Sequence, residues 1–406
     1  MSATKNKTAN KISTPTDRPS RVLLVDDEPF NLDLLEQELG GQGLEIQTAA
    51  DGRQALEWVA QQIPDMIFLD LMMPEMDGFA VLEQLQAHAS WREIPVVIIS
   101  ASTDIDNIVH GIEMGAADFL PKPFEPAILK ARLNAGLEKK RLRDLEQRYL
   151  LSLEREMEIG REIQAGFLPK EIPQPGGWLI NAHFQAAREV AGDFYDVFEV
   201  GEGKVGLLLG DVTDKGVGSA MYMALYRTIL RASMLADTFA EGLENTDCAT
   251  PEECILSAVQ LANRYICRFH DSAMLATLFF AILSTENGRL CYVNAGHDPP
   301  FVLRGNHIQA MIQPTGPIVG AIEQAVYKVE TLSLEPGDML VMYSDGIPDA
   351  QNPEGEMFGG ERFRGVLEKP AQTPAQIFAA TLTALDEHMG TGMQFDDITL
   401  LAVSRD

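Results

Sequence analysis

Short apolar runs alternate with amphipathic stretches over residues 21–137. The runs RVLLVDDE, LEIQTAA, DMIFLDLMM, IPVVIISAS and ADFLPKPF have the length and composition of buried strands. The stretches FNLDLLEQEL, GRQALEWVAQQ, GFAVLEQLQAH, IDNIVHGIEMG and EPAILKARLNAGL carry apolar residues at helical spacing. This alternation predicts an α/β domain with a five-stranded parallel sheet covered by helices on both faces.

The pattern then changes to that of one long helix, which we place at residues 138–168. Its apolar residues recur at spacings of three and four: Leu142, Leu145, Tyr149, Leu153, Met157, Gly160, Ile163 and Phe167. Such a stripe predicts a coiled-coil linker that pairs with its twin in a homodimer. Because the repeat is imperfect, packing of the helix on its own domains explains the stripe equally well. Pro169, Pro173 and Pro175 are expected to end the helix.

Residues 169–406 read as longer strands with a few helices. The strand-like stretches are HFQAAREVAG, KVGLLLGDV, MLATLFFAIL, RLCYVNAG, PPFVLRG, ETLSLEPGDMLVMYSDG and DDITLLAVS, and helices are expected near 220–236, 251–269 and 374–388. This order predicts an α+β sandwich flanked by helices. Residues 238–250 read as a loop that could form a flap.

Charge and composition narrow the function classes. Sixty acidic and 32 basic residues give a net charge of −28, which would repel nucleic acid, so we expect no nucleic-acid partner. The longest apolar run, Met274 to Leu283, is about half of what a membrane helix needs, so we expect no membrane association. Residues 1–20 resemble a disordered tail and not a signal peptide, which favours a cytoplasmic protein. The four cysteines, Cys248, Cys254, Cys267 and Cys291, show no metal-binding spacing and read as reduced thiols.

Polar side chains follow the predicted parallel strands. Asp26 and Asp27 end the first strand, Asp70 the third and Ser100 the fourth, and Lys122 follows the fifth. Carboxyl ends of parallel strands meet at one edge of the sheet. Such acids can bind a divalent cation, and one of them can attack phosphorus. The lysine and the hydroxyl can bind the phosphoryl oxygens, so the set suits an acyl-phosphate site. An acidic loop on a solvated face is the alternative.

The stretches VDDEP, FLDLMMPEMDG, IISAS and LPKPF resemble bacterial response-regulator receiver domains. The resemblance implies a flavodoxin-like fold, a cognate histidine kinase, and Asp70 as the phosphoacceptor. It also implies Mg²⁺ bound by Asp27, Asp70 and the Met72 carbonyl, with Asp26 nearby. By the same resemblance, Ser100 and Phe119 are the switch residues, and Lys122 binds the phosphoryl group.

A second set of acids lies beside glycines in AGDFYD, GDVTDKGVG, YSDG and FDDIT. A phosphate cradle is disfavoured for GDVTDKGVG, because Lys215 precedes Gly216 and no Gly-Lys-Ser/Thr opens the helix. Clustered carboxylates repel one another and are stable as anions around hard cations such as Mg²⁺ or Mn²⁺. Two such ions can activate water and neutralise a phosphoryl group.

Together with REVAGDFYDVF, NAGHDPP and GEMFGGERF, these stretches resemble metal-dependent PPM-type serine/threonine phosphatases of the RsbU/SpoIIE type. The resemblance implies two or more Mn²⁺ or Mg²⁺ ions. The implied ligands are Asp211 as the bridge, the Val212 carbonyl, Asp345 and Asp396, with Asp193 in the outer shell or near a third ion. His297 could orient a loop or donate a proton. For Asp214 and Lys215, exposed loop charge is at least as good a reading as phosphate contact.

Two functions fit this sequence. The first is a two-component response regulator whose receiver controls a metal-dependent phosphatase, acting on a phosphorylated STAS-type anti-sigma-factor antagonist. The second is a non-catalytic adaptor that binds sigma-factor regulators under control of receiver phosphorylation. The complete acidic set favours the enzyme.

Overall fold

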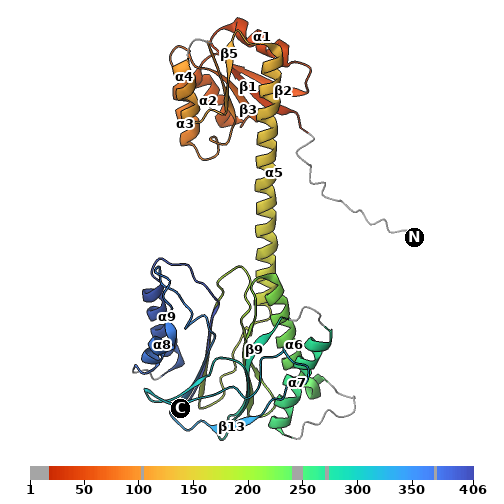
Figure 1. Cartoon of the computed structure of the whole chain (residues 1–406), viewed down its shortest axis with the longest axis vertical. Helices are drawn as coiled ribbons and strands as arrows, with labels where there is room; N and C mark the ends of the chain where they lie inside the picture. Colours follow the sequence, from red (N-terminus) through yellow and green to blue (C-terminus); the bar gives the residue numbers. More distant parts are fainter. Residues whose placement is uncertain (1–17, 102–104, 240–249, 270–273, 370–372) are drawn as a thin grey trace, which may run out of the picture. The chain divides into compact units, whose positions relative to one another are not determined.

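The computed structural model describes residues 18–101, 105–239, 250–269, 274–369 and 373–406. The chain falls into two compact units, Met1–Leu153 and Glu154–Asp406, which are described separately (Figure 1). Among the described helices, none combines the length and apolar character that crossing a bilayer requires. Cys254, Cys267 and Cys291 are not joined in disulfides within the described part of the chain, and Cys248 lies outside it.

The N-terminal unit confirms the predicted parallel sheet. Its strands follow the order β2-β1-β3-β4-β5, and every neighbouring pair is parallel. The strands are β1 (Ser20–Val25), β2 (Leu44–Ala49), β3 (Met66–Asp70), β4 (Val96–Ala101) and β5 (Asp118–Lys122). The helices that alternate with them are α1 (Pro29–Leu39), α2 (Gly52–Gln61), α3 (Gly78–Ala87) and α4 (Ile105–Glu113).

Both faces of this sheet are buried at its inner strands, which explains the apolar runs of β1, β3 and β4. On β1, Leu23 and Val25 belong to one core cluster, whereas Val22 and Leu24 belong to another. Alternate side chains of a strand point to opposite faces, so the two clusters lie on the two sides of the sheet. The polar ends of the strands are therefore left at the edge of the sheet.

The last helix of the N-terminal unit and the predicted linker form one element, α5 (Pro126–Ala165), of 40 residues. Leu129 and Leu133 at its beginning are buried in the N-terminal core. The helix ends at Ala165, before Pro169, so the expectation that the prolines end it was wrong by a few residues. Phe167, the last member of the predicted stripe, lies beyond the helix and packs against the C-terminal core.

The apolar stripe of α5 has two different surroundings. Leu142, Leu145 and Tyr149 are exposed, at 52%, 54% and 65%. Farther along, Met157, Gly160 and Ile163 line a groove of about 500 Å³ together with residues of the C-terminal unit, including Val190 and Met221. The second half of the stripe thus borders the chain's own C-terminal unit, although Ile163 is still 60% exposed.

The C-terminal unit contains two antiparallel five-stranded sheets, in the orders β13-β10-β9-β8-β7 and β12-β11-β14-β15-β6. The first sheet comprises β7 (Phe194–Glu199), β8 (Lys204–Val212), β9 (Ala276–Ser284), β10 (Arg289–Ala295) and β13 (Glu330–Ser333). The second comprises β6 (Trp178–Gln185), β11 (Phe301–Arg304), β12 (His307–Met311), β14 (Asp338–Tyr343) and β15 (Ile398–Arg405). The predicted sandwich is thus confirmed.

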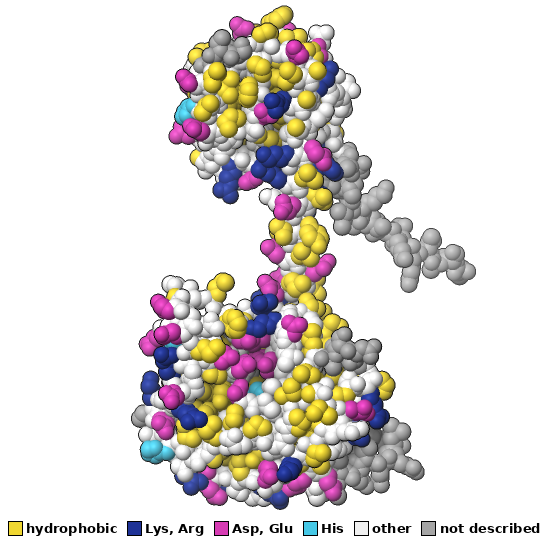
Figure 2. Space-filling view, in the orientation of Figure 1, with side chains coloured by type: hydrophobic (Ala, Val, Ile, Leu, Met, Phe, Trp, Pro, Cys, Tyr) yellow, Lys and Arg dark blue, Asp and Glu magenta, His cyan; other side chains and the backbone are white. Residues whose placement is uncertain are grey.

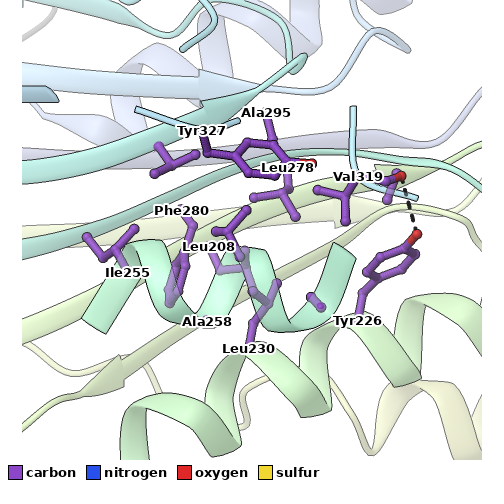
Figure 3. Close-up of a cluster of buried hydrophobic side chains, with 14 of the residues drawn as sticks. Leu208, Tyr226, Leu230, Ile255, Ala258, Leu278, Phe280, Ala295, Val319 and Tyr327 are labelled. Carbon is purple, nitrogen blue, oxygen red and sulfur yellow. Dashed lines mark hydrogen bonds between the residues drawn. The ribbon is translucent and has the colours of Figure 1, made fainter. Parts of the chain in front are cut away.

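Helices cover the outer faces of the sandwich. One core cluster joins residues of both sheets, such as Leu207 on β8 and Leu401 on β15. A second cluster joins the first sheet to α6 (Val217–Phe239) and α7 (Pro251–Phe269), where Leu230 lies near Leu208 and the Tyr226 hydroxyl donates to the Val319 carbonyl (Figure 3). A third joins the second sheet to α8 (Gly359–Leu367) and α9 (Pro374–Met389). The layer order is therefore helices, sheet, sheet, helices.

The structure also corrects several predicted elements. The stretch HFQAAREVAG is a strand only to Gln185, because the following backbone hydrogen-bonds to a carboxylate and not to a neighbouring strand. The stretch ETLSLEPGDMLVMYSDG forms two strands, separated at Gly337, whose φ is 85°. β12 was missed because its side chains are mostly exposed, and β7 and α8 were also not predicted. Of the loop or flap predicted at 238–250, the first two residues belong to helix α6, and 240–249 lie outside the described residues.

Candidate metal and phosphate sites

The carboxyl edge of the parallel sheet brings the predicted receiver residues together. The Nζ atom of Lys122 lies 2.8 Å from an oxygen of Asp26 and 2.8 Å from an oxygen of Asp70. Asp26, Asp27 and Asp70 place one carboxylate oxygen each within 4.8 Å of one another. An all-oxygen set of this size and charge suits a hard divalent cation such as Mg²⁺.

Hydrogen bonds hold Asp26 in place. Its Oδ1 atom accepts from the backbone N–H of Glu28 at 2.9 Å and from the Asn31 side chain at 3.0 Å. Asp26 is fully buried, so these donors and Lys122 replace the water that it loses on folding. Asn31 was not singled out from the sequence, because an asparagine in the first turn of a helix usually reads as a helix-start residue.

Burial and the lysine act in opposite directions on Asp70. Burial raises the pKa of Asp70 above its ordinary value, Lys122 opposes that rise, and the charge of Asp26 adds to it. Burial by itself would lower the pKa of Lys122, but hydrogen bonds to Asp26 and Asp70 outweigh it, so the net shift is upward. Lys122 therefore stays cationic beside Asp70, where it can meet an anionic phosphoryl group.

The remaining receiver residues lie around this pair. Ser100 is 3% exposed, and its hydroxyl has no hydrogen-bond partner within the part of the chain that the structure describes. A buried hydroxyl without a partner is one that an incoming phosphoryl oxygen could satisfy. Phe119 on β5 is half-buried. The Met72 side chain is exposed, and its backbone N–H lies 3.5 Å from Asp70, so this segment borders the acidic group.

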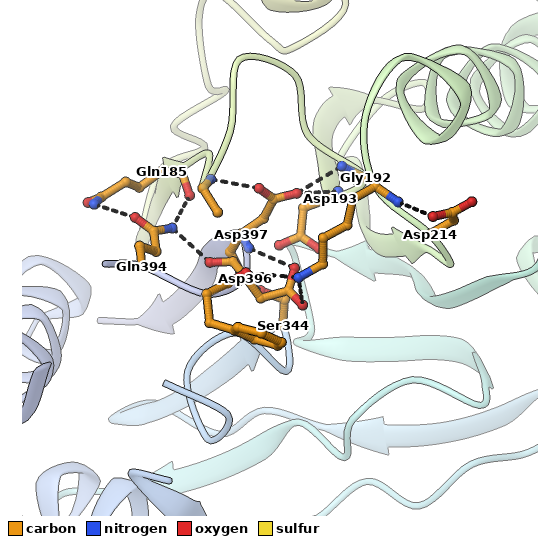
Figure 4. A network of polar contacts seen from close by, with 11 residues as sticks. Gln185, Gly192, Asp193, Asp214, Ser344, Gln394, Asp396 and Asp397 are labelled. Atoms are coloured by element: carbon orange, nitrogen blue, oxygen red, sulfur yellow. Dashed lines mark hydrogen bonds and ion pairs between the residues drawn. The ribbon is translucent and has the colours of Figure 1, made fainter. Parts of the chain in front are cut away.

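A second acidic group lies where the ends of four strands of the C-terminal unit meet. Asp193 directly precedes β7 and Asp211 lies near the end of β8, in the first sheet. Asp345 follows β14 and Asp396 precedes β15, in the second sheet. Figure 2 shows a gathering of acidic side chains on one face of this unit, and Figure 4 shows Asp193 and Asp396 close to each other. The structure thus brings together acids that are up to two hundred residues apart in sequence.

Asp397 organises the loop on which Asp193 lies. Its carboxylate accepts from the backbone N–H groups of Ala187 and Gly192, both at 2.8 Å, and from that of Asp193 at 3.4 Å. Both carboxylate oxygens of Asp397 therefore point to one loop, and its neighbour Asp396 is left to face the other acids (Figure 4). The sequence shows two adjacent acids but does not show this division of roles.

Two glycines let the backbone approach at this site. A Cβ atom on Gly346 would lie 1.9 Å from the Asp397 carbonyl oxygen. A Cβ atom on Gly192 would lie 2.8 Å from the Val212 carbonyl oxygen and 3.4 Å from Asp211. Any larger residue would push apart the segments that carry the acids. The Val212 carbonyl thus lies close to Gly192, at the border of the acidic group.

Three carboxylates of the second group, those of Asp193, Asp211 and Asp345, have pKa values above the ordinary one. Burial, followed by the charges of Asp396 and Asp397, raises the pKa of Asp211 to about 6. Burial, followed by Asp211 and Asp396, raises the pKa of Asp345 to about 7. Burial, followed by the charges of Asp211 and Asp397, raises the pKa of Asp193 well above its ordinary value, despite hydrogen bonds from Ser344 and Thr399.

These shifts show that negative charge is in excess at this site. A bound divalent cation would neutralise that charge, and carboxylate and carbonyl oxygens are its preferred ligands. Among the described residues, no three of these carboxylates bring an oxygen each within 4.8 Å of one another, unlike the receiver group.

His297 lies behind this site and not in it. It is 2% exposed, its Nδ1 atom lies 2.8 Å from the Thr277 hydroxyl, and its backbone N–H donates to Asn294. Thr277 is the register partner of Asp211 between β9 and β8. Burial lowers the pKa of His297 to about 4, so the ring is neutral near pH 7. Of the two roles considered for it, orientation of the loop fits this position better than proton donation.

The raised pKa of Asp345 leads to a testable pH dependence. In the unfolded chain its pKa returns to about 3.8, so between that value and about 7 the folded state holds a proton that the unfolded state has lost. The contribution of Asp345 to stability therefore falls as pH rises through this window. We expect Asp345→Asn to stabilise the metal-free protein, with a gain that grows from pH 5 to pH 8.

Thermal unfolding of the full chain in EDTA at both pH values measures this gain. With Mn²⁺ in excess the sign should reverse, because the variant has lost a proposed ligand and gains less stability from the metal. A gain that is the same at pH 5 and pH 8 would show that Asp345 does not titrate as described.

Comparison with known proteins agrees with both units. The family described as stage II sporulation protein E (SpoIIE) matches residues 201–406, and the response regulator receiver domain matches residues 22–134. Protein IcfG of Synechocystis sp. is 40% identical over 263 residues, which cover 62% of this chain and 41% of the relative. Response regulator PleD of Caulobacter vibrioides is 44% identical over 116 residues, covering 29% of this chain and 26% of the relative. The chain thus spans less than half the length of these curated relatives.

Among solved structures, the SiaA-PP2C domain of Pseudomonas aeruginosa aligns with a TM-score of 0.53 and 20% identity, covering 64% of this chain and 99% of that one. This likeness supports the fold of the C-terminal unit. Because the matched region spans half of the chain, the protein belongs to the SpoIIE family. It carries a response-regulator receiver domain ahead of the phosphatase-type domain.

Proposed function

We propose that the chain is a response regulator whose C-terminal unit is a metal-dependent protein serine/threonine phosphatase. Four carboxylates from four chain segments meet where the two sheets of the sandwich end, and burial together with neighbouring acidic charges raises the pKa of three of them, Asp193, Asp211 and Asp345. This gathering is the observation on which the proposal rests. The family match supports the same activity.

In this proposal Asp211 and the Val212 carbonyl bind one ion, and Asp211, Asp345 and Asp396 bind the other. Asp193 lies behind them, fixed by the Thr399 hydroxyl, and acts from the outer shell or on a third ion. Such ions, Mn²⁺ or Mg²⁺, supply an activated water and positive charge for the phosphoryl group. The chain's own residues hold the carboxylates in place, since Asp397 and the two glycines fix the loops that carry them.

A direct test is hydrolysis of p-nitrophenyl phosphate by the full chain, with Mn²⁺ or with EDTA. Turnover that needs Mn²⁺ supports the proposal, and turnover unaffected by EDTA contradicts it. The proposed substrate is a phosphorylated STAS-type anti-sigma-factor antagonist, which follows from the resemblance to RsbU/SpoIIE-type phosphatases. Loss of its phosphate when mixed with the chain distinguishes an enzyme from an adaptor that only binds it.

We also propose that phosphorylation of Asp70 by a histidine kinase controls this activity, with Mg²⁺ bound by Asp27, Asp70 and the Met72 carbonyl. The helix α5 begins in one unit and ends in the other, so it provides a covalent path for the signal. Near its end, the buried Gln164 side chain donates to the Ala191 carbonyl at 2.6 Å and accepts from the Ala191 N–H at 3.0 Å. Gly192, the next residue, donates to Asp397. A shift of the helix end would thus reach the acidic site through the hydrogen bonds of Gln164 to Ala191 and the hydrogen bond of Gly192 to Asp397.

The exposed apolar residues of α5 support a homodimer through this helix. We expect replacement of Leu145, Tyr149 and Leu153 by serine to weaken the dimer and to uncouple phosphatase turnover from the receiver. Turnover itself should survive, because these residues do not contact the acidic site. Light scattering measures the dimer, and turnover with and without beryllofluoride measures the coupling.

The matched control replaces Gln147 and Glu154 by alanine. At 3.6 residues per turn, these two residues lie on the side of α5 opposite to the apolar stripe. This control should remain dimeric and regulated. A wild-type monomer whose turnover still responds to beryllofluoride would contradict the linker mechanism.

A further inference from the structure

Lys215 spans the two loops that carry proposed metal ligands. Its Nζ atom donates to the Phe395 carbonyl at 2.8 Å and lies 2.8 Å from the Asp396 carboxylate. The same atom lies 4.3 Å from the centre of the Phe395 ring. The lysine comes from the loop after Asp211, 180 residues before its partner Phe395. Every side-chain contact of its ammonium group that the structure records is thus made to this short segment beside the acidic site.

The backbone around Lys215 is shaped for this reach. Asp214, directly before it, has a φ of 75°, and Gly216, directly after it, has a φ of 93°. The Asp214 side chain accepts from the Lys215 N–H at 2.8 Å, which stabilises the turn. Left-handed residues on both sides direct the lysine away from the course of β8 and α6. Asp214 therefore shapes the loop, whereas Lys215 reaches the site.

An ordinary surface ion pair is the simpler reading of this contact. Such pairs are usually formed by one charge contact between two mobile, well-solvated side chains. Here the ammonium has a carboxylate, a carbonyl and an aromatic face as partners, and the lysine side chain is only 30% exposed. Its charge also lowers the pKa of Asp211, against the upward effect of burial. Lys215 thus acts on two of the proposed ligands and not on one surface acid.

We propose that Lys215 is a built-in counter-cation of the metal site, which competes with divalent cations for Asp396 and so sets their affinity. This inference rests on the proposed phosphatase function. A divalent ion on Asp396 would bring its charge close to the ammonium, and like charges at such a distance repel strongly where water is partly excluded. The flexible four-carbon stem lets the ammonium withdraw when an ion binds, but withdrawal gives up its three contacts.

In the metal-free protein the Lys215 ammonium stays on Asp396. With Lys215 in place, one positive charge already offsets part of the acidic excess, so the loops stay together in the metal-free protein. The site would then release its weaker ion readily and load only when the free divalent cation is abundant. Lys215 thus sets the concentration of free divalent cation at which the site fills, and it has no part in the chemical step.

Mn²⁺ binding to the full chain, followed by the electron paramagnetic resonance signal of free Mn²⁺ in the absence of substrate, tests this role. Binding that Asp211→Asn removes is assigned to this site. Lys215→Met keeps the length and apolar stem that pack on Phe395 but removes the charge. We expect it to tighten the weaker ion by about tenfold, as removal of one nearby like charge would. Lys215→Arg, which keeps the charge, should bind Mn²⁺ much as the wild type does.

The matched control is Lys328→Met, because Lys328 lies near Glu252 and Tyr327 and not at the acidic group. It should leave Mn²⁺ affinity unchanged. If the wild type binds Mn²⁺ in an Asp211-dependent way but Lys215→Met binds it equally well or more weakly, the role of Lys215 is overturned and the metal site is not. Absence of Asp211-dependent Mn²⁺ binding in the wild type would overturn the proposed metal site as well.

Discussion

Replacing Asp211 by asparagine is expected to reduce Mn²⁺-dependent turnover by more than about a hundredfold, since loss of a residue that merely orients a metal ligand already has effects of 10- to 100-fold. Asp211 has a larger role in the proposed site, where it is shared by both ions. Burial, followed by the charges of Asp396 and Asp397, raises its pKa to about 6, so removing its negative charge should not destabilise the metal-free fold. Turnover of p-nitrophenyl phosphate over a range of Mn²⁺ concentrations measures the loss.

Asp214→Asn is the matched control for this variant. Asp214 lies three residues along the same loop, is exposed, and has a left-handed backbone that asparagine tolerates. Its side-chain oxygen would still accept from the Lys215 N–H. The control should therefore keep nearly full turnover. If Asp211→Asn keeps it too, the acidic group is not the catalytic centre, and the adaptor function gains support.

Replacing Asp70 by asparagine is expected to abolish phosphorylation of the chain by acetyl phosphate in Mg²⁺. The wild type should gain the mass of one phosphoryl group, and the gain should decay on standing because an acyl phosphate is labile. Asp70 is 5% exposed and lies 2.8 Å from Lys122, so a small donor has to reach a confined carboxylate beside a cation. The variant loses the attacking oxygen but keeps the shape of the side chain.

Asp33→Asn, an exposed change on α1, is the control and should be phosphorylated like the wild type. Intact-mass measurements on the three proteins test both expectations. A stable adduct, or one that maps to serine or threonine, would contradict the assignment of Asp70.

The N-terminal site could be predicted almost completely from the sequence, for a physical reason. In a parallel sheet each strand must be buried on both faces, so it is continuously apolar and its end is marked by the first polar residue. Asp26, Asp70 and Ser100 are such residues, and the carboxyl ends of parallel strands meet at one edge. Only Asn31, which holds Asp26 from the following helix, was missed.

The C-terminal site was harder to predict because its parts lie on different sheets. The sequence of the pair does not show that Asp396 faces the other acids, whereas Asp397 hydrogen-bonds to the loop of Gly192. That division depends on where a loop two hundred residues earlier is folded. Gln164 was overlooked for a similar reason, since a glutamine within a charged helix reads as a solvated position until its partner Ala191 is known.

The length and the continuity of the linker helix α5 could also be predicted only in part. The sequence indicated a helix before residue 138 and another after it, but the helical pattern has no break there, and the structure forms α5 as one element. The contacts of Gln164 place the end of that element against the loop of the acidic site. Control of the phosphatase by the receiver is therefore the central claim about this chain.

The most direct test of that claim is the Mn²⁺-dependent rate at which the full chain removes phosphate from a phosphoprotein substrate, measured with and without beryllofluoride. Beryllofluoride mimics the phosphoryl group on Asp70. We predict that it changes the rate of the wild type, most simply by raising it, and leaves the rate of Asp70→Asn unchanged. Equal rates with and without beryllofluoride in the wild type, at concentrations that saturate the receiver, would contradict the claim.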